Sequence, residues 1–263
     1  MKIKEVIAAL ELVAPLPLQE DYDNAGLQVG LTEAEVSGAL LCLDVTEAVV
    51  AEAAALGCNL IVAHHPLIFH RLSQVTNADY VQRCVIQAIR QSITIVAMHT
   101  NLDNARGGVN FKMAERMGLH GAHFLAPKVV GSIEGGSGLI GQLAAPLSAT
   151  EFIKMVKEQF GVACVMTNEL LQRPIQSVAL CGGAGSFLLS DAIAAGADAF
   201  ITGEMHYHEY FGHEQEIQIC VIGHYESEQF TQQLLQEIIN RECPEVKTYI
   251  TTVRTNPIHY YQS

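Results

Sequence analysis

The chain alternates short, continuously apolar runs with segments in which apolar residues recur at helical spacing. Short apolar runs are typical of buried strands, and a spacing of about 3.6 residues is typical of amphipathic helices. The first half contains a helix at 1–15, a strand at 40–46, a helix at 46–56, a strand at 59–65, a helix at 79–90, a strand at 93–99 and a helix at 109–119. This alternation predicts an α/β fold with mixed, largely parallel sheets flanked by helices.

A second α/β series follows a stretch at 121–145 that contains five glycines within residues 131–141. Its elements are a helix at 149–160, a strand at 177–183, a helix at 188–195, strands at 199–203 and 217–224, a helix at 227–240 and a strand at 247–253. The glycines mark a connection. We therefore predict two similar α/β domains, residues 1–125 and 126–263, with the C-terminal tail packing back on the first.

Composition narrows the functional class. Of the 263 residues, 49% are hydrophobic and 16% are charged, which excludes a disordered chain. The net charge of −13 argues against a nucleic acid or an anionic membrane as partner. No apolar run approaches the roughly 20 residues of a membrane helix. The seven cysteines form no C-x-x-C pair, as in reduced cytosolic proteins, so we expect a cytoplasmic location.

Two segments carry a histidine and a carboxylate four residues apart, directly after an apolar strand. They are AMHTNLD, with His99 and Asp103, and IGHYESE, with His224 and Glu228. Open α/β sheets place their ligands at the carboxyl ends of strands. The match indicates an internal duplication with both sets facing one cleft between the domains. The alternative is the general similarity of short β-α-β units.

The adjacent histidines His64 and His65 end the strand at 59–65. Neighbours on a regular strand point to opposite faces, so both can ligate only where the chain bends. Pro66 disfavours helical geometry at His65 and so favours such a bend. The alternative is a core histidine bonded to the backbone. Glu204 corresponds in register to His65, and we consider it a candidate general base or a solvated loop residue.

Imidazoles with carboxylates, and without thiolates, suit Zn, Mn, Fe or Co. His99 is either a metal ligand or a residue that orients a ligand. Glu228 fits a metal ligand or a helix-start carboxylate, and Asp103 fits a ligand or a turn cap. Further histidines that would suit metal capture are His70, His206, His208 and His213.

The glycine-rich segment CGGAGS at 181–186 lies between a strand and a helix. Such a loop can receive a phosphate on its amides. It lacks the Lys-Ser/Thr ending of a nucleoside triphosphatase loop, so we favour a tight turn.

The motifs DNAGLQVG, LDVT, AHHPLIF, HTNLD, TGEMHYHE and GHYESE occur in this order across the chain. In this it resembles the NIF-three-like family, whose members are named GTP cyclohydrolase 1 type 2 homologues. The resemblance covers about residues 21–231 and fits the short form, without an inserted domain.

The resemblance implies two divalent metal ions per chain in a cleft between two α/β domains. It also implies a homohexamer, a trimer of dimers. The ligands that it implies are His64, His65, Asp103, His224 and Glu228.

The family name implies metal-activated attack of water on GTP, with formate released. Glu204 or His99 would then shuttle protons. We therefore expect a dinuclear hydrolase that acts on a nucleotide-like substrate. The alternative is a metal-handling or regulatory assembly without turnover.

Overall fold

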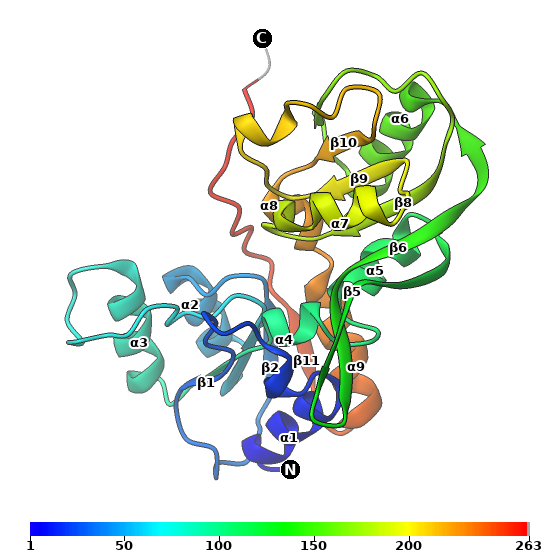
Figure 1. Ribbon diagram of the computed structural model, residues 1–263. Coiled ribbons are helices and arrows are strands. Elements are labelled where there is room, and N and C mark those ends of the chain that lie inside the picture. Colours follow the sequence, from blue (N-terminus) through cyan, green and yellow to red (C-terminus); the bar gives the residue numbers. More distant parts are fainter. Residues whose placement is uncertain (262–263) are drawn as a thin grey trace. The chain divides into compact units, whose positions relative to one another are not determined.

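The computed structural model describes residues 1–261, which form two compact units (Figure 1). The first unit comprises Met1–Leu102 and the chain from Thr231 onward, and the second comprises Asp103–Phe230. The division thus differs from the boundary expected after residue 125. The chain leaves the first unit after Leu102 and returns to it after Phe230. Its last strand then extends the first sheet, and its last helix packs on that sheet.

The first unit is built on a five-stranded sheet in the order β1-β4-β3-β2-β11. Its strands are β1 (Gly26–Val29), β2 (Ala39–Cys42), β3 (Leu60–Ala63), β4 (Thr94–Ala97) and β11 (Thr248–Ile250). All neighbours are parallel except β1, which is antiparallel to β4. The registers Cys42↔Ala63 and Ala63↔Ala97 align the carboxyl ends of three strands. Residues that follow these ends are therefore neighbours.

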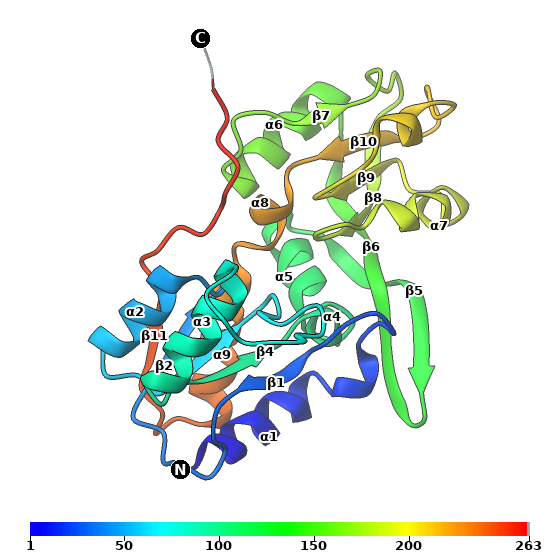
Figure 2. The same cartoon turned by 90° about the vertical axis from the view of Figure 1, so that its left-hand side faces the viewer.

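Helices cover both faces of this sheet (Figure 2). They are α1 (Ile3–Val13), the short η1 (Leu16–Leu18), α2 (Glu47–Ala55), α3 (Tyr80–Arg90) and α9 (Thr231–Glu242). Helices α2 and α3 bury Val49, Val50 and Val85 against Leu40 and Ile61 of the sheet. On the opposite side, α9 contacts β2, β11 and α1.

The second unit has a six-stranded sheet in the order β5-β6-β8-β9-β10-β7. Its strands are β5 (His120–Val130), β6 (Ile133–Leu147), β7 (Met166–Thr167), β8 (Ile175–Cys181), β9 (Ala199–Thr202) and β10 (Gln218–Val221). Strands β8, β9 and β10 are parallel, and the remaining pairs are antiparallel. Its helices are α5 (Val109–Arg116), α6 (Ala149–Phe160), η2 (Ser186–Leu188), α7 (Leu189–Ala194), η3 (Tyr207–Tyr210) and α8 (His224–Glu228).

Two apolar layers sandwich this second sheet. Phe152 and Phe160 of α6 pack on the side of Leu180, together with residues of α5. Ala192 of α7 packs on the other side, with Phe200. The mixed α/β class is confirmed, with more antiparallel pairing in the second sheet than the apolar runs indicated.

The glycine-rich stretch is not the expected connection between domains. It forms the long hairpin β5–β6, which turns at Gly131 with a φ of +64°. A Cβ added at Gly136 would meet the side chain of Phe124 at 2.8 Å, and one at Gly138 would meet that of Leu188 at 2.7 Å. These glycines permit close strand packing and do not act as a linker.

The two sheets share one strand order, which supports the duplication hypothesis. In the first sheet, the antiparallel edge strand β1 lies beside the parallel series β4-β3-β2. In the second sheet, the antiparallel edge strand β7 lies beside the parallel series β10-β9-β8. Strand β4 thus corresponds to β10 and β3 to β9, as the alignment of the motifs requires. Within residues 1–261, no helix is both long and apolar enough to cross a membrane.

Candidate functional site

Three imidazoles gather at the carboxyl ends of β3 and β4 in the first unit. The ring centroids of His64 and His65 are 4.9 Å apart, and each lies 5.4 Å from the centroid of His99. The aligned strand ends bring these side chains together, since His64 and His65 follow β3 and His99 follows β4. His64 is fully buried, whereas His65 and His99 are partly exposed.

Each of these rings is held through its Nδ1 atom. Nδ1 of His64 lies 2.8 Å from the carbonyl oxygen of Met98, which can only accept a hydrogen bond. Nδ1 of His65 lies 2.7 Å from Oδ1 of Asp44, and that of His99 lies 2.7 Å from Oδ1 of Asp23. The Nδ1–H group of His64 is therefore the donor, and its Nε2 carries the lone pair. Metal-ligating histidines characteristically have such a partner, which fixes the ring and leaves Nε2 for the metal.

The two supporting carboxylates are held in the ionised form. Burial acts to raise the pKa of Asp23, but hydrogen bonds from His99, Thr100 and the Asn24 amide outweigh it and lower the pKa to about 2. Burial likewise opposes ionisation of Asp44, and the hydrogen bond with His65 helps to lower its pKa below the ordinary value. Both carboxylates therefore accept from the imidazoles at neutral pH.

The second unit presents a histidine and a glutamate on one helical turn. His224 opens α8 after β10, and Nε2 lies 3.1 Å from Oε2 of Glu228, at the end of the same helix. Nδ1 of His224 lies 2.9 Å from Oε1 of Glu204, which follows β9. The Glu228 side chain is 4% exposed, whereas that of Glu204 is 56% exposed. The predicted pair on one helical turn is thus present, although α8 is separate from the long helix α9.

The CGGAGS loop forms the cradle of Glu228. Gly183 has a φ of +60°, and a Cβ added there would collide with Oε1 of Glu228. The amide of Gly183 donates to Oγ of Ser227, and that of Gly182 donates to Oδ1 of Asn110. Because these amides are engaged within the protein, the structure favours the tight turn over a phosphate loop.

Asp103, His206, His208 and His213 are the remaining candidates. Asp103 is the last residue of α4 (Thr100–Asp103), where the second unit begins, and its carbonyl accepts from Nδ2 of Asn110 at 3.1 Å. His206 and His208 are exposed at η3, and His213 pairs with Glu216 at 2.8 Å.

The sequence patterns did not mark Asp23, Asp44 or Thr255 as functional residues. Asp23 lies in DYDNAG and Asp44 in LDVT, and both motifs contributed only to the resemblance. The hydroxyl of Thr255 donates to Oδ2 of Asp44 at 2.6 Å. Asp44 lies two residues beyond the end of β2, level with His65 by the register Cys42↔Ala63, and this position was the available signal.

Known proteins resemble this chain over most of its length. Residues 1–257 match the family model described as Duf34/NIF3 (NGG1p interacting factor 3). A relative from Clostridium perfringens, named GTP cyclohydrolase 1 type 2 homolog, is 35% identical over 229 residues, 87% of each chain. One of the same name from Lactococcus lactis is 32% identical over 266 residues, 98% of this chain and 99% of the relative.

Solved structures share the fold over nearly the whole chain. A Bacillus cereus protein related to NIF3 superimposes with a TM-score of 0.89 at 25% identity, and each chain is 99% covered. A Staphylococcus aureus hypothetical protein gives a TM-score of 0.90 at 26% identity, with the same coverage. By the family model and by these relatives, the chain is a member of the Duf34/NIF3 family.

Proposed function

We propose that the protein binds two divalent metal ions per chain and uses them to hydrolyse a nucleotide-like substrate. The observation that carries the proposal is the shared arrangement of four imidazoles. His64, His65, His99 and His224 each hold Nδ1 against a carbonyl or a carboxylate. Structural histidines have no need for four such supports at strand ends, whereas metal ligands do.

The donor set fits a hard or borderline divalent metal. The proposed core of the centre is the group His64, His65 and Glu228. His224 and Asp103 complete the proposed ligand set. These donors are imidazole nitrogens and carboxylate oxygens, which suit Zn, Mn, Fe or Co. Five ligands for two ions leave coordination positions for water and substrate.

The bound metal would supply Lewis-acid chemistry and lower the pKa of a water molecule. The chain's own residues position the site. Asp44 and Asp23 fix the rings of His65 and His99, and Glu204 fixes that of His224. The contact of Glu204 with Nδ1 favours a positioning role over that of a general base. His99 supplies a third imidazole beside His64 and His65, where it can hold or move a proton.

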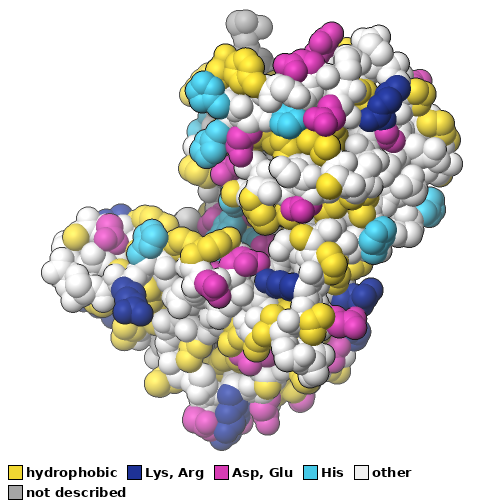
Figure 3. All heavy atoms as spheres, viewed as in Figure 1, with side chains coloured by type: hydrophobic (Ala, Val, Ile, Leu, Met, Phe, Trp, Pro, Cys, Tyr) yellow, Lys and Arg dark blue, Asp and Glu magenta, His cyan; other side chains and the backbone are white. Residues whose placement is uncertain are grey.

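The acidic surface supports a small-molecule substrate over a nucleic acid. Lys and Arg total 15 against 28 Asp and Glu. On the face drawn in Figure 3, the Lys and Arg side chains are dispersed and form no continuous patch. The names of the relatives direct the first assays to GTP and other nucleotides.

Elemental analysis of untagged protein tests the metal centre. We expect about two ions per chain, lost in His64→Ala and in Glu228→Ala. A substrate screen with the metal found should then reveal turnover that is absent in His65→Ala. Metal that is absent after soaking would refute the centre. Full metal content without turnover of any nucleotide or phosphoester would refute the hydrolase and favour metal handling.

We also propose the homohexamer that the family resemblance implies. Light scattering coupled to size exclusion should give six times the chain mass of 28.5 kDa. A monomer at micromolar concentration would contradict it.

A further inference from the structure

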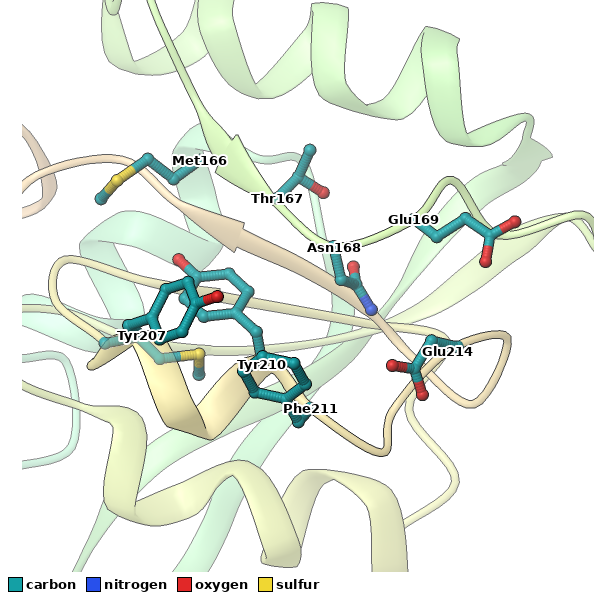
Figure 4. Close-up of a pocket in the computed structure, with 9 residues that line it drawn as sticks. Met166, Thr167, Asn168, Glu169, Tyr207, Tyr210, Phe211 and Glu214 are labelled. Carbon is teal, nitrogen blue, oxygen red and sulfur yellow. The ribbon is translucent and has the colours of Figure 1, made fainter.

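The second unit contains a pocket that the proposed metal chemistry does not use. Its volume is about 570 Å³, within the range of about 300–1,000 Å³ that holds small organic ligands. Strand β7 and the two residues after it form one wall, and the loop between β9 and β10 forms the other (Figure 4).

One end of the pocket is apolar and aromatic. The rings of Tyr207 and Phe211 pack edge to face with centroids 5.4 Å apart. The side chains of Tyr207, Phe211 and Met166 are 73%, 58% and 57% exposed. Large apolar side chains that face a concavity and remain solvated gain free energy when a ligand covers them.

The other end of the pocket is anionic. In the view of Figure 4, the carboxylates of Glu169 and Glu214 lie toward one end, and Met166 and Tyr207 lie toward the other. Neither carboxylate has an ion pair with the described residues, and the nearby Arg173 is paired with Asp198. This end therefore favours a cation and repels a phosphate.

A buried hydroxyl at the aromatic end lacks a partner. The OH group of Tyr210 is inaccessible to solvent and has no hydrogen-bond partner within residues 1–261. Burial raises the pKa of Tyr210, so the hydroxyl stays neutral. In Figure 4 it lies on the side of Met166 and Tyr207. An unpaired buried hydroxyl is costly, but solvent does not reach this one, so a ligand in the pocket would meet other atoms of Tyr210 and not its hydroxyl.

We propose that this pocket binds an arylalkyl ammonium ligand, which goes beyond the proposed metal function. The aromatic ring of the ligand lies against Tyr207 and Phe211, and its ammonium group faces Glu169 and Glu214. Stacking on aromatic rings and charge attraction act together on such a ligand.

Ligand-observed NMR titration tests the proposal with three probes of similar shape. They are phenethylamine, its ring-hydroxylated analogue tyramine, and 3-phenylpropanoate, in which a carboxylate replaces the ammonium group. We expect phenethylamine to bind at least about fivefold more tightly than 3-phenylpropanoate, and tyramine to bind about as tightly as phenethylamine, because the Tyr210 hydroxyl is out of reach. The order should be the same in the presence of EDTA, which separates this site from the metal centre.

Substitutions assign the binding to the pocket. The double variant Glu169→Gln with Glu214→Gln should lower the affinity for phenethylamine by about fivefold. Tyr207→Ala should lower it by a similar factor. The matched controls Glu158→Gln and Phe187→Ala are exposed in the same unit and outside the pocket. They should leave the affinity unchanged.

Tyr210→Phe removes only the inaccessible hydroxyl and should leave the affinity for both amines unchanged. Equal binding of the ammonium and carboxylate probes would overturn the proposal. So would unchanged binding in the double glutamine variant, provided that its thermal unfolding matches the wild type.

Discussion

The hydroxyl of Thr255 donates to Oδ2 of Asp44 at 2.6 Å, although 211 residues separate the two in the sequence. The other oxygen of the same carboxylate accepts from His65 at 2.7 Å. A residue near the C-terminus thereby orients a proposed metal ligand through one intermediate side chain.

Loss of this support should weaken metal binding. We expect Asp44→Ala to lower the affinity by about 10–100-fold, as is typical when the partner of a metal-ligating histidine is removed. Thr255→Val should cause a smaller loss in the same direction, because it removes one hydrogen bond to a charged group. Competition with a chromophoric chelator measures both affinities.

Thr252→Val is the matched control for Thr255→Val. The hydroxyl of Thr252 donates to Glu52 at 2.6 Å and has no contact with Asp44. Both variants lose one hydroxyl from the same segment, so a general loosening of the segment would affect them equally. Equal metal affinities in the two variants would rule out the positioning role of Thr255.

Gly183→Ala should displace Glu228 and abolish or strongly reduce metal binding. The added Cβ would collide with Oε1 of Glu228, and the positive φ adds backbone strain. Gly196→Ala has the same kind of strain at a φ of +74°, but its Cβ meets nothing within 4 Å. Elemental analysis should find metal in Gly196→Ala and little in Gly183→Ala. Normal metal content in both variants would show that Glu228 is not a ligand.

Stability should depend on the ionisation of Asp23 at low pH. Its pKa of about 2 in the folded protein lies below the ordinary value of 3.8, so the carboxylate stabilises the fold above pH 3.8. This contribution is lost as the pH falls from 3.8 through 2, and the shift corresponds to about 2 kcal/mol. The Asp23 side chain is fully buried, so solvent screens the interaction little.

Urea unfolding of the wild type and of Asp23→Asn at several pH values tests this dependence. The variant should be less stable at pH 7, and the difference should shrink below pH 3.8. A difference that is independent of pH would assign the effect to packing and not to charge.

The second unit should depend strongly on its aromatic core. Phe152 is fully buried and packs in the cluster that contains Phe160 and Leu180. Phe152→Ala should lower the free energy of unfolding by about 3–5 kcal/mol. Phe187, 61% exposed, serves as the comparison, and Phe187→Ala should change stability by less than about 0.5 kcal/mol. Denaturant titration distinguishes these values.

The parallel strands of both sheets were predictable from the sequence, because they lie in largely apolar runs. Strand β3, for example, is Leu60–Ala63 within the expected 59–65. Strands β5 and β6 were not predicted, because the glycine-rich stretch that contains them has the composition of a connection. Strands β1 and β7 were not predicted either. The first begins at Gly26 within a segment of turn composition, and the second has only two residues. Pairing with β4 and β10 creates them, so no local pattern indicates them.

The candidate site was predictable where function requires a rare residue at a strand end, as at His64, His65 and His224. The supporting residues were not, because a single aspartate or threonine in a turn is common. The contact between Asp44 and Thr255 forms only because the chain returns to the first unit. The periodicity of apolar residues over short windows cannot predict such a return. The domain boundary was misplaced for the same reason, since β11 pairs with β2 across some two hundred residues.

The interrupted first unit also determines the order in which the protein can be completed during synthesis. The second unit is one continuous stretch and emerges whole from the ribosome, at about 5–20 residues per second. The N-terminal segment, although made first, must wait for α9 and β11. During this interval one flank of β2 is open to pairing with a neighbouring nascent chain. Of the two units, the first therefore keeps an unpaired strand edge for longer during synthesis.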